Sequence, residues 1–463
     1  MKNSTSLSKL GFCCFTILAS FFFACSKEKN DAGAISLLSI TANSINLVNG
    51  TINVPSDVTI ELTFSAALDI PKFEAAFSLT AASGAVSPGF SYANASSKAL
   101  VALSQLTPNT QYSLKLNRTA IGLNGEVLDQ NISINFTTAD GGIITEMAPC
   151  ISATNACLET AVLTNGTGTD FNFDFYSSYP IFLENARWEK LKNVVIVTHG
   201  QNRDADNYYA IMMTTLRNEN LDGNTILIAP FFKNNADAQA GDLYWSDNGW
   251  REGQNANTAS AGISAFAVID AILARLADKT HFPVLKNVVV TGHSSGALFT
   301  HAYAAANKSE PLYPDLDFTY VIANSQYFYY PDDVRYDENS GQFVVPTGCV
   351  AFNHWPLGFV NPPPYLTGVT EATVDQQIVG RKITYLLGTS DTVAGGTLNT
   401  TDCEAVLLGA NRFKRGEHIF SLLETNYPGV HNSQKVLVPG VGHDAQGMYQ
   451  SAVFRGLLGG LLE

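Results

Sequence analysis

The sequence predicts two folded units: an all-β sandwich over residues 34–139, and a doubly wound α/β domain with a mostly parallel sheet over residues 140–463. Short runs in which apolar and polar residues alternate indicate the first unit, because this period places one strand face in a core and the other in water. Continuous apolar runs that alternate with helical patterns indicate the second unit. The 463 residues suffice for both.

The first 24 residues have the pattern of a secretory signal peptide. Two lysines precede the apolar run Leu10–Ala24, which is shorter than the roughly 20 residues of a spanning helix. The run ends in a small residue directly before Cys25, which resembles the lipobox of bacterial lipoproteins. The resemblance implies cleavage before Cys25, a lipid on its sulfur and a polar lipidated tether over residues 25–33. The alternative is an ordinary signal peptide in which Cys25 is incidental. We therefore expect an outer-membrane lipoprotein of the cell envelope, anchored to the membrane at Cys25 and facing the surface or the periplasm.

Residues 34–139 contain short apolar runs separated by Asn, Gly, Pro and Ser. In Val58–Phe64 every second residue is apolar, which is typical of a strand with one buried face. The other runs are Ile35–Ile40, Ala99–Leu103, Tyr112–Leu116 and Ile132–Phe136.

Three segments of this unit, Val58–Asp69, Leu106–Tyr112 and Ile132–Asp140, resemble the Ig-like domains of bacterial surface proteins. The resemblance implies a spacer that holds the second unit away from the membrane. Carbohydrate binding is the alternative, although the aromatic residues it needs are sparse here.

Residues 140–463 alternate helical patterns with apolar runs of strand length. Ala265–Ala277 is predicted to be a helix, because its apolar residues recur every three or four positions. The alternation favours a sheet covered by helices on both faces. The predicted strands are Asn193–Thr198, Thr225–Pro230, Asn287–Thr291, Tyr320–Ala323, Ile383–Leu387 and Lys435–Val438.

The composition argues against several classes of function. The net charge is −14, with 27 basic and 41 acidic residues and no basic patch, which argues against a nucleic-acid partner. No C-x-x-C or H-E-x-x-H pattern is present, so no metal site is predicted. No Gly-rich phosphate loop is present either, and we expect no cofactor.

Four cysteines remain once the predicted signal peptide and Cys25 are set aside. An even number in an exported protein predicts disulfides. The simplest of the three possible pairings is Cys150–Cys157 with Cys349–Cys403.

The most informative motif is Gly292-His293-Ser294-Ser295-Gly296, which has the form G-x-S-x-G. It follows the apolar run Asn287–Thr291 directly and precedes Ala297–Ala304, which has helix-forming composition. A strand, a tight turn flanked by glycines and a helix are the context of a nucleophile elbow, where serine sits on a strained turn. We therefore expect Ser294 to be a nucleophile.

A serine nucleophile needs a base and an acid that orients the base. Two later predicted strands end in loops with such residues, Asp391 and His443. The chain order Ser294, Asp391, His443 is that of α/β-hydrolases, and about residues 145–463 resemble their serine esterase and depolymerase branch. The resemblance implies that His443 is the base and that Asp391 orients it. The competing candidates are Asp444 as the acid and His293, His301, His418 and His431 as the base.

Two backbone N–H groups are expected to stabilise the oxyanion. The first belongs to Ser295, at the start of the helix after Ser294. The second follows from the resemblance, because Val194–Gln201 is similar to the His-Gly loop after the third strand of the family's fold, which implies the N–H of Gln201. An ordinary Gly-containing turn is the alternative.

Five side chains are predicted to border the substrate. Tyr244, Trp245 and Trp250 lie in a polar, turn-rich loop that suits a cleft for a sugar ring or an aryl group; a surface loop held by tryptophan packing is the alternative. Tyr327 follows the strand after the elbow, and His199 belongs to the predicted oxyanion loop.

Together these observations predict a carboxylic ester hydrolase that works through an acyl-enzyme on extracellular polymer-linked or glycan-linked esters, or on a polyester. Three alternatives stay open: a serine peptidase of the same fold, a catalytically weak surface binding or adhesion protein, and a lipase for long acyl chains.

Overall fold

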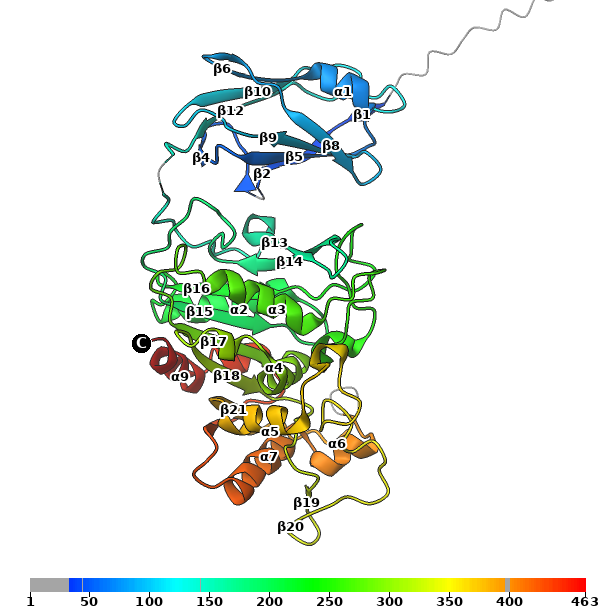
Figure 1. The fold of residues 1–463 in the computed structure, drawn as a ribbon, viewed down its shortest axis with the longest axis vertical. Helices are drawn as coiled ribbons and strands as arrows, with labels where there is room; N and C mark the ends of the chain where they lie inside the picture. The colour runs from blue at the N-terminus through cyan, green and yellow to red at the C-terminus, as the bar shows by residue number, and fades with distance from the viewer. Residues whose placement is uncertain (1–32, 44, 142, 396–399) are drawn as a thin grey trace, which may run out of the picture.

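The computed structural model describes residues 33–43, 45–141, 143–395 and 400–463 (Figure 1). The predicted signal peptide, Cys25 and all but the last residue of the predicted tether lie outside the described residues. Within the described ranges, no helix is both long enough and apolar enough to span a bilayer.

The N-terminal unit is a sandwich of two five-stranded sheets (Figure 1). In β5 (Val58–Phe64) every second side chain is buried, as its period of two predicts, and β12 (Ile132–Thr138) alternates in the same way. One sheet has the order β3 (Ile45–Asn46), β2 (Leu37–Ala42), β5, β9 (Lys98–Leu103), β8 (Gly89–Ala93). The other has the order β4 (Thr51–Val54), β12, β10 (Gln111–Leu116), β6 (Phe77–Ala81), β7 (Gly84–Ala85).

Two small elements complete this unit. Helix α1 (Ile70–Ala76) begins at Asp69, whose side chain accepts from the Lys72 N–H, and it buries Phe73 in the sandwich core. Strand β1 (Ala34–Ile35) pairs with β11 (Val127–Leu128).

The C-terminal unit is built on one eight-stranded sheet. Its order is β13 (Leu158–Thr164), β14 (Asp170–Ser177), β16 (Thr225–Pro230), β15 (Asn193–Thr198), β17 (Asn287–His293), β18 (Asp317–Ala323), β21 (Ile383–Gly388), β22 (Ser433–Val438). The first three strands pair antiparallel, and all pairings from β16 to β22 are parallel. The predicted strands coincide with β15, β16, β17, β18, β21 and β22, within a few residues at their ends.

Helices cover both faces of this sheet, which explains the continuous apolar strands (Figure 1). In β15, Val194 and Ile196 belong to the core on one face, whereas Val195 and Val197 belong to the core on the other. The first face packs against α3 (Ala265–Leu276), α4 (Ser295–Ala306), α5 (Glu371–Gly380) and α7 (Arg412–Asn426). The second packs against α2 (Ala205–Asn218), α8 (Ala445–Tyr449) and α9 (Ala452–Leu462).

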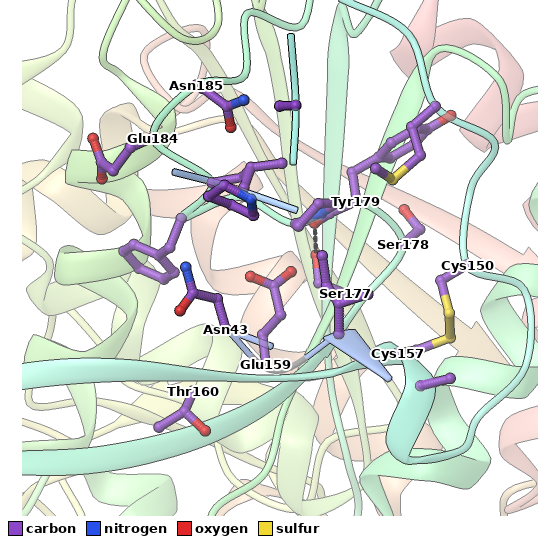
Figure 2. Close-up of a pocket in the computed structure, with 18 of the residues that line it drawn as sticks. Asn43, Cys150, Cys157, Glu159, Thr160, Ser177, Ser178, Tyr179, Glu184 and Asn185 are labelled. Atoms are coloured by element: carbon purple, nitrogen blue, oxygen red, sulfur yellow. Dashed lines mark hydrogen bonds between the residues drawn. A yellow bond between two sulfur atoms is a disulfide. The ribbon is translucent and has the colours of Figure 1, made fainter. Parts of the chain in front are cut away.

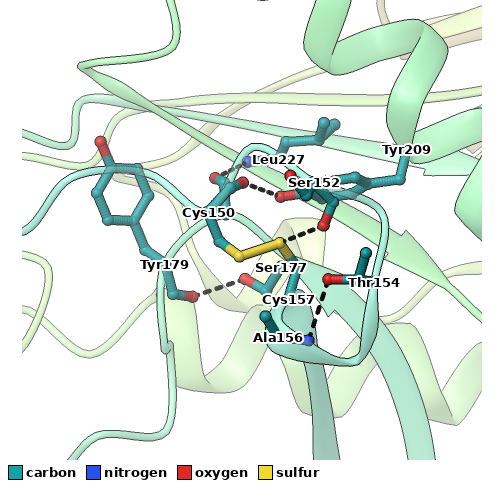
Figure 3. The surroundings of a disulfide bond; sticks show 10 residues. Cys150, Ser152, Thr154, Ala156, Cys157, Ser177, Tyr179, Tyr209 and Leu227 are labelled. Atoms are coloured by element: carbon teal, nitrogen blue, oxygen red, sulfur yellow. Dashed lines mark hydrogen bonds between the residues drawn. A yellow bond between two sulfur atoms is a disulfide. The ribbon is translucent and has the colours of Figure 1, made fainter. Parts of the chain in front are cut away.

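Two disulfides join the predicted cysteine pairs, which confirms both. Cys150–Cys157 lies beside the start of β13 (Figure 3), and the Tyr209 hydroxyl of α2 donates to the Cys150 carbonyl. Cys349–Cys403 joins the segment after the β19–β20 hairpin (Arg335–Asp337 and Gln342–Val344) to the first residue of α6 (Cys403–Leu408).

Candidate active site

Ser294 stands on a sharp turn between β17 and α4. Its backbone has φ 59° and ψ −117°, a conformation that non-glycine residues rarely adopt. The two flanking glycines make the turn possible, because a Cβ on Gly292 would overlap the carbonyl of Gly296, and a Cβ on Gly296 would overlap the carbonyls of Thr198 and His199. The predicted strand, elbow and helix are therefore all present.

Three residues far apart in the chain meet at this turn. Nε2 of His443 lies 2.9 Å from Oγ of Ser294, and Nδ1 of His443 lies 2.8 Å from Oδ2 of Asp391. The Asp391 side chain is 2% exposed and that of His443 is 11% exposed, so water is largely kept from both. This geometry lets His443 accept the Ser294 proton while Asp391 holds the ring in the matching tautomer.

The loops that carry Asp391 and His443 are tied to each other. They follow β21 and β22, whose carboxyl ends meet at the same edge of the sheet as that of β17. The Ser390 N–H donates to the Val441 carbonyl at 2.9 Å, and the Gly440 N–H donates to the Thr389 hydroxyl at 2.9 Å. The spacing between Asp391 and His443 is thus held by hydrogen bonds between the two loops that carry them.

Asn324 is a further link between these loops. It follows β18 and is 1% exposed. Its Oδ1 accepts from the Gly388 N–H at 2.8 Å, and its Nδ2 donates to the Gly442 carbonyl at 3.0 Å. This role could not be predicted from sequence, where the only signal was the residue's place after a predicted strand near the elbow.

The two predicted oxyanion residues lie side by side. The Ser295 hydroxyl donates to Oε1 of Gln201 at 2.9 Å. Ser295 is the first residue of α4, where a backbone N–H has no acceptor within the helix. The close approach of Gly296 to Thr198 and His199 brings the loop that follows β15 against the start of α4.

Short helix η2 (Asn248–Glu252) adds two residues to this side of the site. The Gln201 amide donates to Oδ1 of Asn248 at 2.6 Å. Nη1 of Arg251 lies 3.4 Å from the Ser295 hydroxyl and 3.5 Å from Oε1 of Gln201. Sequence reasoning missed both residues, although they lie within the loop that it singled out for its aromatic side chains.

The prediction of substrate-cleft residues is wrong for three of the five side chains. His199, Trp245 and Trp250 are fully buried. The tryptophans pack in the core around Phe232, at ring-centroid distances of 5.4 and 5.3 Å, so the loop is held by tryptophan packing. Tyr244 and Tyr327 are half-buried and keep some contact with solvent.

His199 has a structural role instead. Its Nε2 accepts from the Phe232 N–H at 3.2 Å, so its Nδ1 carries the proton and donates to the Gly200 carbonyl at 2.9 Å. Burial lowers the pKa of His199 to about 4, which keeps the ring neutral. The residue therefore supports the predicted oxyanion loop from inside the core.

The competing candidates have other partners. Asp444 is the N-cap of α8, where its side chain accepts from the Gln446 N–H. Burial lowers the pKa of His301 to about 3, and its Nδ1 accepts from the Tyr329 N–H. His418 contacts the Leu408 carbonyl through Nδ1, and Nδ1 of His431 accepts from the Ser433 N–H.

His293 packs directly against the His443 ring. The two ring centroids lie 4.6 Å apart, and His293 is 3% exposed. Burial is the main reason why the pKa of His293 lies well below its usual value. The neighbouring His443 and Arg412 lower this pKa further. A neutral ring beside His443 limits that side chain's movement without competing for the Ser294 proton.

A cavity of about 800 Å³ lies between the two units, away from Ser294 (Figure 2). Residues of both units line it, among them Asn43, Asp57 and Tyr179. Burial raises the pKa of Glu159, which also lines it, to about 8. The three residues that meet at the elbow are not among its lining residues, so it is separate from the candidate active site.

One group of potential metal ligands occurs among the described residues, formed by Cys349, Cys403 and Glu404. Its two sulfur atoms are bonded to each other, so this group does not form a thiolate site.

Comparison with known proteins places the N-terminal unit in a family. Residues 39–138 match the model of the bacterial Ig-like domain. This unit is therefore a bacterial Ig-like domain, as the sequence predicted. No curated protein is significantly similar to the chain.

Several solved structures are similar to the chain at low identity. One is poly(aspartic acid) hydrolase-1 from Sphingomonas sp. KT-1, with 19% identity, a TM-score of 0.45 and coverage of 63% of this chain and 96% of that chain. Another is LpqC, a poly(3-hydroxybutyrate) depolymerase from Bordetella parapertussis, with 19% identity, a TM-score of 0.44 and coverage of 63% and 86%. A third is XC6422 from Xanthomonas campestris, an α/β serine hydrolase without lid, with 12% identity, a TM-score of 0.31 and coverage of 66% and 93%.

Proposed function

We propose that the protein is a serine hydrolase of carboxylic esters that acts through an acyl-enzyme. The observation that carries the proposal is the hydrogen-bonded series Ser294, His443, Asp391 on a strained elbow at the carboxyl edge of a parallel sheet. The elbow between strand and helix, and the chain order of the three residues, are those of α/β-hydrolases.

The reaction follows from the positions of the three side chains. Oγ of Ser294 attacks the ester carbonyl carbon while Nε2 of His443 takes the hydroxyl proton. The bond to the alcohol oxygen then breaks, and His443 returns the proton to the leaving alcohol. Water, activated by the same imidazole, hydrolyses the acyl-enzyme and releases the carboxylic acid. Asp391 stays ionised throughout and stabilises the imidazolium form of His443.

The negative charge that develops on the carbonyl oxygen needs preorganised donors. The N–H groups of Gln201 and Ser295 are the proposed pair. The contact between their side chains and the packing of Gly296 against the Thr198–His199 backbone support this assignment.

The proposal also includes a cellular location for the reaction. Lipid attachment at Cys25 would fix the chain to the cell envelope, and the bacterial Ig-like domain would hold the hydrolase unit away from the membrane. Such an arrangement suits polymer-linked or glycan-linked esters, or a polyester, which cannot enter the cell.

The test compares wild type with Ser294→Ala on p-nitrophenyl butyrate, on a panel of acetylated sugars and aliphatic polyesters, and on unmodified peptides. We expect ester hydrolysis by wild type and a loss of about 10⁴-fold or more in Ser294→Ala, because the nucleophile is removed. A fluorophosphonate probe should label wild type and leave the variant unlabelled. Ester hydrolysis that survives in Ser294→Ala would refute the mechanism. Hydrolysis of peptides without that of esters would reassign the protein as a peptidase.

A further inference from the structure

A guanidinium group lies against the side chains of the two proposed oxyanion residues, and the proposed reaction does not use it. Arg251, in η2, places Nη1 3.4 Å from the Ser295 hydroxyl and 3.5 Å from Oε1 of Gln201. These are the two residues whose N–H groups are proposed to hold the oxyanion. The cation therefore borders the position of the scissile carbonyl.

The guanidinium of Arg251 has one carboxylate partner among the described residues, in an ion pair with Glu252. Its Nε is buried and has no hydrogen-bond partner among the described residues. The nearest carboxylate is that of Glu252, at 3.6 Å from Nε, which is beyond hydrogen-bond distance. Burial raises the pKa of Glu252, and the neighbouring charge of Arg251 acts in the opposite direction. The carboxylate of Asp247 accepts from the Gly249 N–H and so has a partner of its own.

A second arginine lies buried near the site. Arg412 is 4% exposed; burial lowers the pKa of its guanidinium, and the negative charge of Asp391 opposes this shift. Its Nη2 donates to Oε1 of Gln326 at 3.0 Å. Nε and Nη1 of Arg412 are buried without a hydrogen-bond partner among the described residues, so this arginine is also incompletely satisfied.

The geometry points to Arg251 as a specificity-determining residue that binds a carboxylate on the acyl part of the ester, a few atoms from the scissile carbonyl. A guanidinium presents its N–H groups in a planar fork that matches the two oxygens of a carboxylate. The side chain of Arg251 is 14% exposed, so the pair would form in a partly desolvated place where charge recognition is strong. The substrate class is then the half-ester of a short dicarboxylic acid, or a polyester whose acid unit carries a free carboxylate.

This inference rests on the proposed function, and its test uses three esters followed by pH-stat titration. Monoethyl succinate carries a carboxylate on the acyl side. Ethyl 4-methylpentanoate replaces that carboxylate by an isopropyl group of similar shape. The 3-acetoxypropanoate ion carries its carboxylate on the alcohol side. We expect wild type to prefer monoethyl succinate over ethyl 4-methylpentanoate in kcat/KM by about tenfold or more, with a preference that falls as NaCl is added.

The variants separate recognition from a structural role. Arg251→Gln should lose the preference for the succinate ester, mainly through a higher KM for monoethyl succinate, so that kcat/KM falls more for this ester than for ethyl 4-methylpentanoate. Arg251→Lys should retain part of the preference, because it keeps the charge but not the planar fork. Arg217→Gln in α2, whose side chain is 56% exposed, is the matched control for net charge and should behave as wild type.

Three results would overturn the inference. One is an equal loss on both ethyl esters in Arg251→Gln, which indicates a structural role. The second is a preference for the neutral ester, and the third is a preference that appears only for 3-acetoxypropanoate. In each case hydrolysis that depends on Ser294 would leave the proposed function standing. Absence of Ser294-dependent hydrolysis of any ester would overturn both proposals.

Discussion

The side-chain amide of Asn324 donates to the main-chain carbonyl of Gly442 at 3.0 Å, one residue before the proposed catalytic base. The same side chain accepts from the Gly388 N–H at 2.8 Å, three residues before the proposed acid. One buried amide thus holds the starts of both loops. Asn324 also has φ 50°, a conformation that asparagine tolerates better than most residues.

Asn324→Gly should lower kcat for ester hydrolysis by about 10- to 100-fold, because the loops of Asp391 and His443 lose a shared partner and small misplacements are costly. Glycine tolerates the positive φ, so the variant removes the hydrogen bonds without adding strain. Asn307→Ala is the matched control, since Asn307 is equally buried and its Nδ2 donates to Tyr303 and Tyr320 away from the triad. The kcat values of the two variants are compared by steady-state kinetics, at a temperature well below the melting temperature of either variant. Equal kcat values in the two variants would show that Asn324 only supports the fold.

Gly296→Ala should prevent correct folding or abolish activity, because the added methyl group would overlap the backbone carbonyls of Thr198 and His199. Backbone atoms cannot rotate away as a side-chain end can, so the strand or the helix must shift. The control is Gly456→Ala in α9, where nothing lies within 4 Å of the new methyl group. That change should stabilise the protein by about 0.5–1 kcal/mol, because alanine favours helix. Thermal unfolding of the soluble fractions measures both effects, and a Gly296→Ala protein with wild-type stability and activity would contradict the proposed packing.

Replacing Cys349 and Cys403 together by serine should destabilise the protein more than the same change at Cys150 and Cys157. The first disulfide closes a separation of 54 residues and the second a separation of 7. Loop entropy then predicts that the free energy of unfolding falls by roughly 4 kcal/mol without Cys349–Cys403 and by roughly 2 kcal/mol without Cys150–Cys157. Urea unfolding of the two double variants tests the order. A larger loss from the Cys150–Cys157 pair would mean that local packing, including the Tyr209 bond to Cys150, outweighs loop entropy.

The free energy of unfolding should fall as the pH is lowered from about 6.5 towards 4. Burial lowers the pKa of His199 to about 4 and that of His301 to about 3. Both rings are neutral when folded, whereas the unfolded chain binds protons below about pH 6.5, so acid favours unfolding. Each histidine should lower the free energy of unfolding by on the order of 1–2 kcal/mol at pH 5.

Urea unfolding at pH 7, 6 and 5 measures this slope, and His301→Gln should show a shallower one than wild type, since one buried titrating group is gone. Stability that holds or rises between pH 6.5 and 5 in wild type would contradict this account.

The position of the proposed nucleophile could be predicted from sequence because the elbow is a local structure. The strand β17, the glycines at 292 and 296 and the helix α4 are adjacent in the chain, and each is specified by its own residues. Asp391 and His443 could be predicted for a related reason, since each follows an apolar strand and parallel strands bring their carboxyl ends to one edge. The even number of cysteines predicted the disulfides in the same manner, without requiring knowledge of the packing.

The substrate-facing residues could not be predicted in this way. A turn-rich loop with tryptophans has the same sequence pattern whether it lines a cleft or packs inward. Trp245 and Trp250 pack inward because Phe232 and Phe299 offer them an aromatic core. The same folding turns Arg251 towards Ser295, a contact across 44 residues of sequence.

The sequence by itself therefore determined the two units, the strands, the elbow and the chain order of the proposed reacting residues, because the period of the hydrophobic pattern and the turn chemistry are local properties. The tertiary structure alone decided which side chains surround the proposed reacting residues. Asn324 meets Gly442 across 118 residues and Arg251 meets Gln201 across 50. Such contacts depend on how separate elements pack, and packing is set by shape and burial over the whole sheet rather than by any one segment.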